Sequence, residues 1–245
     1  MERKKYLLIL FIVLLINAPA GAHTRFKNII YDAFVNDKME KWKEAVITME
    51  KQKDNDTDYL LELIGYQYGY TAWCLGNNKK EDAEIFLSQM ENNLVKLENT
   101  EGKICEYHAF KAAAYGFKIG LSNWRAPFLG PKSMDHAEKA LEKDSMCMQA
   151  NLEMGNIWSH MPKIFGGSKE KALHYYLKAL DIIEDKDPQI RKNNWIYLNL
   201  LVLAGQTEKE LGNKQSALEY YKKTLEIEPG FTWVKNELLP SLLNK

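Results

Sequence analysis

Apolar residues recur every three to four positions along most of the chain, which is the spacing of one face of an α-helix. Residues 171–182 and 216–227 show this pattern clearly and read almost alike, KALHYYLKALDI and SALEYYKKTLEI. After residue 26 no run alternates apolar and polar residues between hairpin-turn signals, so we expect no β-sheet. The pattern predicts an all-α protein built from similar helical units.

The clearest unit spans residues 198–229. Its small, aromatic and proline residues stand at offsets 8, 15, 20, 24 and 32 from the start: Gly205, Gly212, Ala217, Tyr221 and Pro229. The small residues at offsets 8 and 20 let two antiparallel helices approach closely, the glycine at offset 15 suits a left-handed turn, and the proline stops the second helix. A second copy spans residues 148–185, with a longer turn between its two helices.

On these offsets the chain resembles the tetratricopeptide repeat (TPR) superfamily. The resemblance implies a right-handed superhelical array, and weaker copies upstream bring it to about five helical hairpins. Residues 231–243 then form a C-terminal capping helix, and residues 23–245 form a single domain. Residues 128–131 and 161–168 share a weaker resemblance with the periplasmic T component of tripartite (TRAP) solute transporters.

Residues 1–22 have the pattern of a signal peptide: three cationic residues, an apolar run over residues 7–16, and small residues that suit cleavage after Ala20 or Ala22. The apolar run is too short to span a bilayer, which takes about 20 residues. We therefore expect an exported protein of the periplasm or the extracellular space, with no transmembrane span once the signal is removed.

The balance of charge and the missing motifs exclude several classes of function. The 33 Lys and Arg residues match 33 Asp and Glu residues, so nothing attracts the chain to nucleic acid. The sequence contains no HExxH, GxSxG, CxxC, EF-hand or phosphate-cradling loop. No two histidines stand four residues apart. We therefore predict no catalytic residues, no metal site and no cofactor, and thus a protein that is not an enzyme.

The three cysteines are Cys74, Cys105 and Cys147. An odd number leaves at least one thiol unpaired within a monomer, even in a compartment where disulfides form. Cys105 and Cys147 lie near the predicted starts of helices in successive repeats, which makes a disulfide between them conceivable. Buried, inert thiols are the favoured interpretation.

Two surfaces are candidates for binding. The first is the concave face, which the TPR resemblance places on the first helix of each unit: Tyr66, Tyr70 and Trp73 in an early unit, Asn156 and His160 in a later one. The second is a pair of extended turns over residues 123–131 and 160–167, each with a proline, an aromatic residue and a cation. Because the turns belong to consecutive units, we expect them side by side.

The predicted function is a non-enzymatic scaffold of the cell envelope that binds a protein or peptide partner. The residues predicted to contact it are Tyr66, Tyr70, Trp73, Trp124, Arg125, Asn156, His160, Lys163 and Phe165. The structural alternative is that the tyrosines and Trp73 pack between repeats and that the turns tuck under the array. The functional alternative is an accessory that binds a small solute for a transporter, which requires an enclosed apolar pocket.

Overall fold

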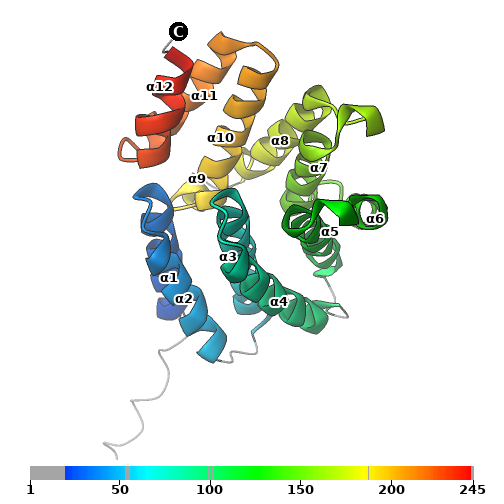
Figure 1. Ribbon diagram of the computed structural model, residues 1–245. Coiled ribbons are helices and arrows are strands. Elements are labelled where there is room, and N and C mark those ends of the chain that lie inside the picture. Colours follow the sequence, from blue (N-terminus) through cyan, green and yellow to red (C-terminus); the bar gives the residue numbers. More distant parts are fainter. Residues whose placement is uncertain (1–19, 53–55, 99, 101, 187, 244–245) are drawn as a thin grey trace, which may run out of the picture.

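The computed structural model describes residues 20–52, 56–98, 100, 102–186 and 188–243, and over these residues the protein is all-α. Antiparallel helix pairs stack into a curved array (Figure 1). In the described residues the pairs are α1–α2, α3–α4, α5–α6, α7–α8 and α10–α11, which confirms the prediction of about five hairpins. The α-helices are α1 (Ala20–Val35), α2 (Met39–Gln52), α3 (Thr57–Gly76), α4 (Lys80–Leu97), α5 (Ile104–Leu121), α6 (Ala126–Lys143), α7 (Met148–His160), α8 (Lys169–Glu184), α9 (Pro188–Arg191), α10 (Trp195–Glu210), α11 (Lys214–Ile227) and α12 (Leu239–Leu243).

Short elements complete the array. The 3₁₀ turns η1 (Asn123–Arg125) and η2 (Lys163–Phe165) follow α5 and α7, and the π turn η3 (Val234–Leu238) precedes α12. Together η3 and α12 form the predicted C-terminal cap. The cap buries Phe231 and Leu242 in the same apolar cluster as residues of α10 and α11.

Helix boundaries in the last two units follow from local capping. Ser168 accepts a hydrogen bond from the backbone N–H of Lys171 at 3.1 Å and begins α8. Gly212 has φ +88° between α10 and α11, a left-handed conformation that glycine adopts without a steric cost. α11 ends at Ile227, two residues before Pro229. The left-handed turn at Gly212 and the end of α11 before Pro229 both lie where the sequence predicts them.

In each of the last two hairpins, α7–α8 and α10–α11, a glycine of the first helix packs against a tyrosine ring of the second helix. A Cβ atom on Gly205 would lie 2.6 Å from Cε1 of Tyr221, and a Cβ on Gly155 would overlap the ring of Tyr176. Both tyrosines are almost fully buried. The two hairpins therefore pack in the same way, and the longer turn between α7 and α8 does not alter that packing.

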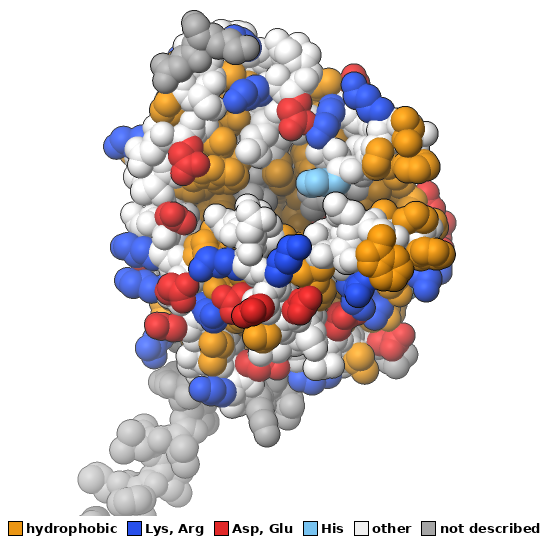
Figure 2. All heavy atoms as spheres, in the orientation of Figure 1, with side chains coloured by type: hydrophobic (Ala, Val, Ile, Leu, Met, Phe, Trp, Pro, Cys, Tyr) orange, Lys and Arg blue, Asp and Glu red, His pale blue; other side chains and the backbone are white. Residues whose placement is uncertain are grey.

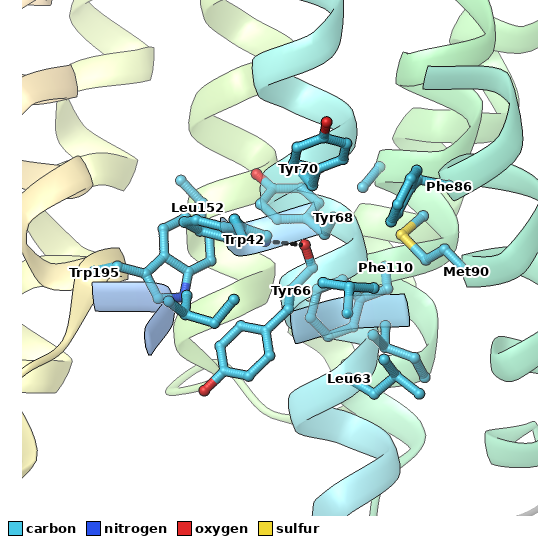
Figure 3. Packing of buried hydrophobic residues seen from close by; sticks show 14 of the residues in the cluster. Trp42, Leu63, Tyr66, Tyr68, Tyr70, Phe86, Met90, Phe110, Leu152 and Trp195 are labelled. Carbon is cyan, nitrogen blue, oxygen red and sulfur yellow. Dashed lines mark hydrogen bonds between the residues drawn. The ribbon is translucent and has the colours of Figure 1, made fainter. Parts of the chain in front are cut away.

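The array curves until its first and last hairpins meet. Phe34 of α1 packs against Phe231 of the cap, with ring centroids 4.9 Å apart. Trp42 of α2 meets Trp195 of α10 edge to face at 5.0 Å (Figure 3). A Cβ atom on Gly69 of α3 would lie 2.7 Å from each of these tryptophans, so the glycine makes room for the contact. Tight aromatic packing thus joins the two ends of the chain.

The first of the two predicted extended turns is mostly helical. Only Asn123–Arg125 form a 3₁₀ turn, and α6 begins at Ala126, so the expectation of an extended turn as far as Pro131 is wrong. The physical reason is that Pro127 lies in the first turn of α6, where its missing N–H and fixed φ favour a helix start. The second turn matches its prediction, with η2 between α7 and α8.

Cys105 and Cys147 form a disulfide, with Cα atoms 6.6 Å apart. The interpretation of all three cysteines as inert thiols is therefore wrong for this pair, because α5 and α7 lie beside each other and bring the two residues together. Cys74 is a free, buried thiol. Burial raises the pKa of Cys74 to about 11, so this thiol stays protonated.

Residues 1–19, most of the predicted signal peptide, lie outside the described residues. The signal peptide and its cleavage sites remain predictions. Among the residues that the structure does describe, no helix is long and apolar enough to cross a membrane.

Candidate functional site

The aromatic residues predicted to line the concave face at α3 lie mostly in the core. Tyr66 and Tyr70 are 5% and 0% exposed. The Tyr70 ring contacts Trp73 and Phe86, with ring centroids 5.6 and 4.6 Å away, and Figure 3 shows it turned toward Phe86. Trp73 is half-buried, and the ammonium of Lys79 lies 5.2 Å from the centroid of its ring. The packing alternative therefore describes the two tyrosines, which offer a partner little surface.

Asn156 on α7 is engaged inside the protein. Its Nδ2 donates to the Tyr68 hydroxyl at 3.1 Å and its Oδ1 accepts from the Tyr176 hydroxyl at 3.0 Å. The same network holds Glu153, which is 3% exposed and accepts from Gln149 Nε2 at 2.8 Å. Burial raises the pKa of Glu153 to about 7. This network joins α3, α7 and α8 across the concave side and supports the fold.

Helices α5 and α7 run parallel, which places the turns that follow them at the same end of the array. The disulfide joins Cys105 and Cys147 near their starts. Seven residues further along each helix, Ala112 and Met154 belong to one buried cluster. The ends of α5 and α7 therefore point the same way, and η1 and η2 lie at the same end of neighbouring hairpins.

We call residues 123–132 and 160–169 the tip segments. Four large apolar side chains in these segments are turned to solvent, and Figure 2 shows hydrophobic side chains gathered on the side of the molecule where α6 and the turn after α7 lie. These residues form what we call the apolar edge: Trp124 (70% exposed), Phe128 (68%), Ile164 (86%) and Phe165 (71%). Water-exposed apolar side chains gathered in this way mark interaction sites. The alternative in which the turns tuck under the array does not describe these four residues.

The tip segments carry cations and no carboxylates. Arg125, Lys132, Lys163 and Lys169 lie in them, and neither segment contains Asp or Glu. Lys169 forms an ion pair with Glu210 of α10 at 2.6 Å. The other three cations of the tip segments are Arg125, Lys132 and Lys163.

Backbone contacts hold the second tip segment in place. Gly166 has φ +93°, and a Cβ on Gly167 would collide with the backbone oxygen of Met161. The backbone N–H of Ser168 donates to the Trp158 carbonyl at 3.2 Å and closes the loop. This conformation requires both glycines and turns the side chains of η2 outward.

His160 ends α7 beside η2 and is exposed. Its Nδ1 lies 2.9 Å from the backbone oxygen of Asn156. Because a carbonyl oxygen only accepts, Nδ1 carries the hydrogen of this contact, which leaves Nε2 as the ring nitrogen outside it. The imidazole can therefore accept a hydrogen bond or bind a metal through Nε2.

Two surface pockets lie elsewhere. One, of about 310 Å³, is lined by Tyr31, Arg191, Lys192, Asn193, Tyr197, Ile227 and Glu228. The other, of about 290 Å³, is lined by Glu208, Ser216, Glu219, Tyr220 and Lys223. Both are open to solvent and contain charged residues, and neither includes a predicted site residue. They do not match the enclosed apolar pocket that the small-solute hypothesis requires.

The structure thus divides the predicted site. Trp124, Arg125, His160, Lys163 and Phe165 lie in the tip segments at one end of two neighbouring hairpins, whereas the tyrosines of α3 and Asn156 serve the core. Sequence reasoning did not select Phe128 and Ile164, which complete the apolar edge. A usable signal was present, because each is a large apolar residue in a segment that lacks acidic residues.

No protein-family model matches this sequence, and no curated protein matches it. Solved structures share its fold. The HusA haemophore from Porphyromonas gingivalis aligns with a TM-score of 0.59 at 17% identity, over 76% of this chain and 93% of that one. A thermophilic TPR protein from Thermus thermophilus aligns with a TM-score of 0.55 at 15% identity, over 90% of this chain and 98% of that one. At these identities the likeness establishes a TPR-like helical repeat fold.

Proposed function

We propose that this protein is a non-enzymatic binding protein of the cell envelope that docks a protein or peptide partner on its apolar edge. One observation carries the proposal: four large apolar side chains, each more than two-thirds exposed, lie at the same end of two packed hairpins. Aromatic residues that a partner removes from water contribute strongly to binding. The TPR-like fold is consistent with a binding role, because such arrays present rigid surfaces.

The charge around the edge indicates the chemistry of the partner. Arg125, Lys132 and Lys163 lie in the same segments as the apolar side chains, and the tip segments contribute no carboxylate. An apolar partner surface with acidic residues at its rim would complement this arrangement. Arg125 also stacks near Trp124, with its guanidinium carbon 5.7 Å from the ring centroid, which favours a defined orientation of both side chains.

An envelope location is supported by two features. The first 22 residues have the pattern of a signal peptide. The disulfide between Cys105 and Cys147 suits an oxidising compartment, since cytosolic thiols are usually kept reduced. Export to the periplasm or the extracellular space is therefore part of the proposal.

The test combines affinity capture with site-specific crosslinking from an envelope extract. The chain from His23 onward is compared with a double variant of the apolar edge, Trp124→Ser with Phe165→Ser. The matched control is Ile85→Ser with Val95→Ser on α4, because these residues are also apolar and exposed, at 52% and 64%. A photo-crosslinker in place of Ile164 reports which retained protein touches the edge.

We expect one retained protein that binds the parent chain and the α4 control, is lost from the edge variant, and crosslinks through position 164. Retention of the same proteins by all three chains, without a crosslink, would show that the edge is not a docking surface. Circular dichroism of the three chains establishes that each is folded.

A second candidate function is the binding of haem or a related porphyrin. The HusA haemophore shares the fold, and the tip segments of this chain contain groups that suit such a ligand. His160 presents a free Nε2 beside the apolar edge, Arg125 and Lys163 could pair with carboxylates, and Phe165 could cover an apolar ring face. This form of the small-solute hypothesis needs an exposed edge rather than an enclosed pocket.

Titration with hemin, followed through the Soret band, tests this second function. If hemin binds the parent chain and its Soret spectrum differs when it binds His160→Ala, that difference would support iron ligation by the His160 imidazole. Metal-free protoporphyrin should bind the parent chain and His160→Ala equally. If the Soret band of hemin with the parent chain does not differ from that of hemin in buffer alone, or if hemin binds the edge variant as it binds the parent chain, the protein-partner function stands alone.

A further inference from the structure

Two histidines from different helices, His108 of α5 and His136 of α6, face each other across the α5–α6 hairpin. Nδ1 of His108 lies 2.9 Å from Nδ1 of His136, and the ring centroids are 5.0 Å apart. Both rings are only partly buried. This pair lies apart from the apolar edge, and the proposed function does not use it.

The helices that carry the pair are locked together. Ala109, Ala112, Ala137 and Ala140 are at most 1% exposed, so α5 and α6 approach closely. The Ser133 hydroxyl donates to the backbone oxygen of Ala112 at 2.9 Å and links the helices a second time. The spacing of the two imidazoles is therefore set by rigid elements, which is what a preorganised ligand site requires.

The two nitrogens share one hydrogen. Burial lowers the pKa of both histidines; Lys139 and Lys143 lower that of His108 further, while Asp135 acts in the opposite direction on each ring. One Nδ1–H donates to the lone pair of the other Nδ1, and each ring keeps Nε2 as a second nitrogen outside this contact.

The spacing of the nitrogens matches that of two neighbouring metal ligands. Imidazole nitrogens bind transition metals at about 2.0–2.1 Å, so two of them at a right angle are about 2.9 Å apart in square-planar or octahedral coordination. We propose that His108 and His136 form a two-imidazole site for a divalent transition metal of the copper or nickel class. A tilt of each ring directs both lone pairs to the ion, and the shared hydrogen moves to Nε2 of its own ring.

The site is open rather than closed. Among the described residues no group of three or more His, Cys, Asp or Glu side chains could hold a metal, so water or an external ligand completes the coordination. Two neutral nitrogen donors favour copper over the other divalent ions, which follows the general order of stability. Such a site suits exchangeable binding, not a structural ion.

The test uses Cu²⁺ itself, by calorimetry and by electron paramagnetic resonance at neutral pH. All chains carry His23→Ala, because a histidine near a free amino terminus would chelate copper independently. We expect the parent chain to bind one Cu²⁺ at this site with hyperfine structure from two imidazole nitrogens. His108→Ala and His136→Ala should each weaken binding at least tenfold, whereas His174→Ala, which removes an exposed histidine of α8, should leave it unchanged.

His136→Gln covers the case in which the alanine variants lose stability, since it keeps a polar side chain of similar reach but no imidazole. Copper should also raise the melting temperature of the parent chain and not that of His136→Gln. The proposal is overturned if the parent chain binds no Cu²⁺, if its spectrum shows fewer than two imidazole nitrogens, or if His136→Gln binds as tightly as the parent.

Discussion

Replacing Glu153 by Gln is expected to leave the stability of the protein unchanged at about pH 4.5 and below, and to raise it increasingly as the pH rises toward neutral. Glu153 lies on α7, is 3% exposed, and has amide and hydroxyl neighbours rather than a cation. A carboxylate in such a place loses its hydration without gaining an opposite charge. Burial therefore raises its pKa from 4.5 to about 7, although hydrogen bonds from Tyr68, Asn156 and Gln149 oppose the rise.

The sign and size of the effect follow from that shift. Because the folded state holds the proton more tightly than the unfolded state, the stability contributed by Glu153 is complete below pH 4.5 and is lost as the pH rises through about 7. One pKa unit corresponds to about 1.4 kcal/mol, so the loss amounts to about 3 kcal/mol. Gln has the shape of the protonated acid and carries no charge, so the unfolding free energy of the variant should not fall as the pH rises.

Urea unfolding of both proteins at a series of pH values measures the difference directly. The gap in unfolding free energy should be near zero at about pH 4.5 and open to about 3 kcal/mol in favour of Glu153→Gln by about pH 8.5. Glu138→Gln, a change at an exposed carboxylate of α6, is the control and should follow the parent curve. Parallel curves for the parent and Glu153→Gln, or a variant less stable at every pH, would refute the reasoning.

Three further outcomes test the packing. Ala217→Leu should cost about 1 to 3 kcal/mol by overpacking a fully buried position, whereas Ser216→Leu on a neighbouring face should change the melting temperature less; equal effects would contradict the repeat register. Gly205→Ala should cost a similar amount, about 1 to 3 kcal/mol, because its methyl group would meet the facing tyrosine ring, and an unchanged urea midpoint would show that the ring gives way freely. Replacing Cys105 and Cys147 together by Ser should remove about 2 to 4 kcal/mol and make the melting temperature insensitive to dithiothreitol, which should lower that of the parent; a parent that dithiothreitol does not affect would argue against the disulfide.

The helical hairpins could be predicted because their determinants lie close together in the sequence. Gly205, Gly212, Ala217 and Tyr221 fall within 17 residues, and each meets its partner inside one hairpin. Spacing at this range follows from helix geometry, so the register and the turn were readable. The same reasoning fails at residues 123–131, where the prolines suggest an extended turn although Pro127 lies in the first turn of α6.

Which side of α3 is exposed could not be predicted, because the helix is apolar around most of its circumference. Tyr66 and Tyr70 looked like candidates for a binding face by their repeat positions. Tyr66 packs against Trp42 of α2 and Tyr70 against Phe86 of α4. The close fit at Gly69 of the same helix involves Trp195, from more than a hundred residues away. The pattern of residues along one helix indicates that a face is apolar, but it does not indicate which other element covers that face.

The sequence by itself determined the all-α class, the number of hairpins, the turns at Gly212 and Gly166–Gly167, and the presence of aromatic residues in the tip segments. These follow from local periodicity and from residues with special backbone freedom. Only the tertiary structure decided that Cys105 meets Cys147, that His108 meets His136, and that the apolar edge stays uncovered. Each depends on how helices from different parts of the chain pack, and that is set by the summed burial of many side chains rather than by any one segment.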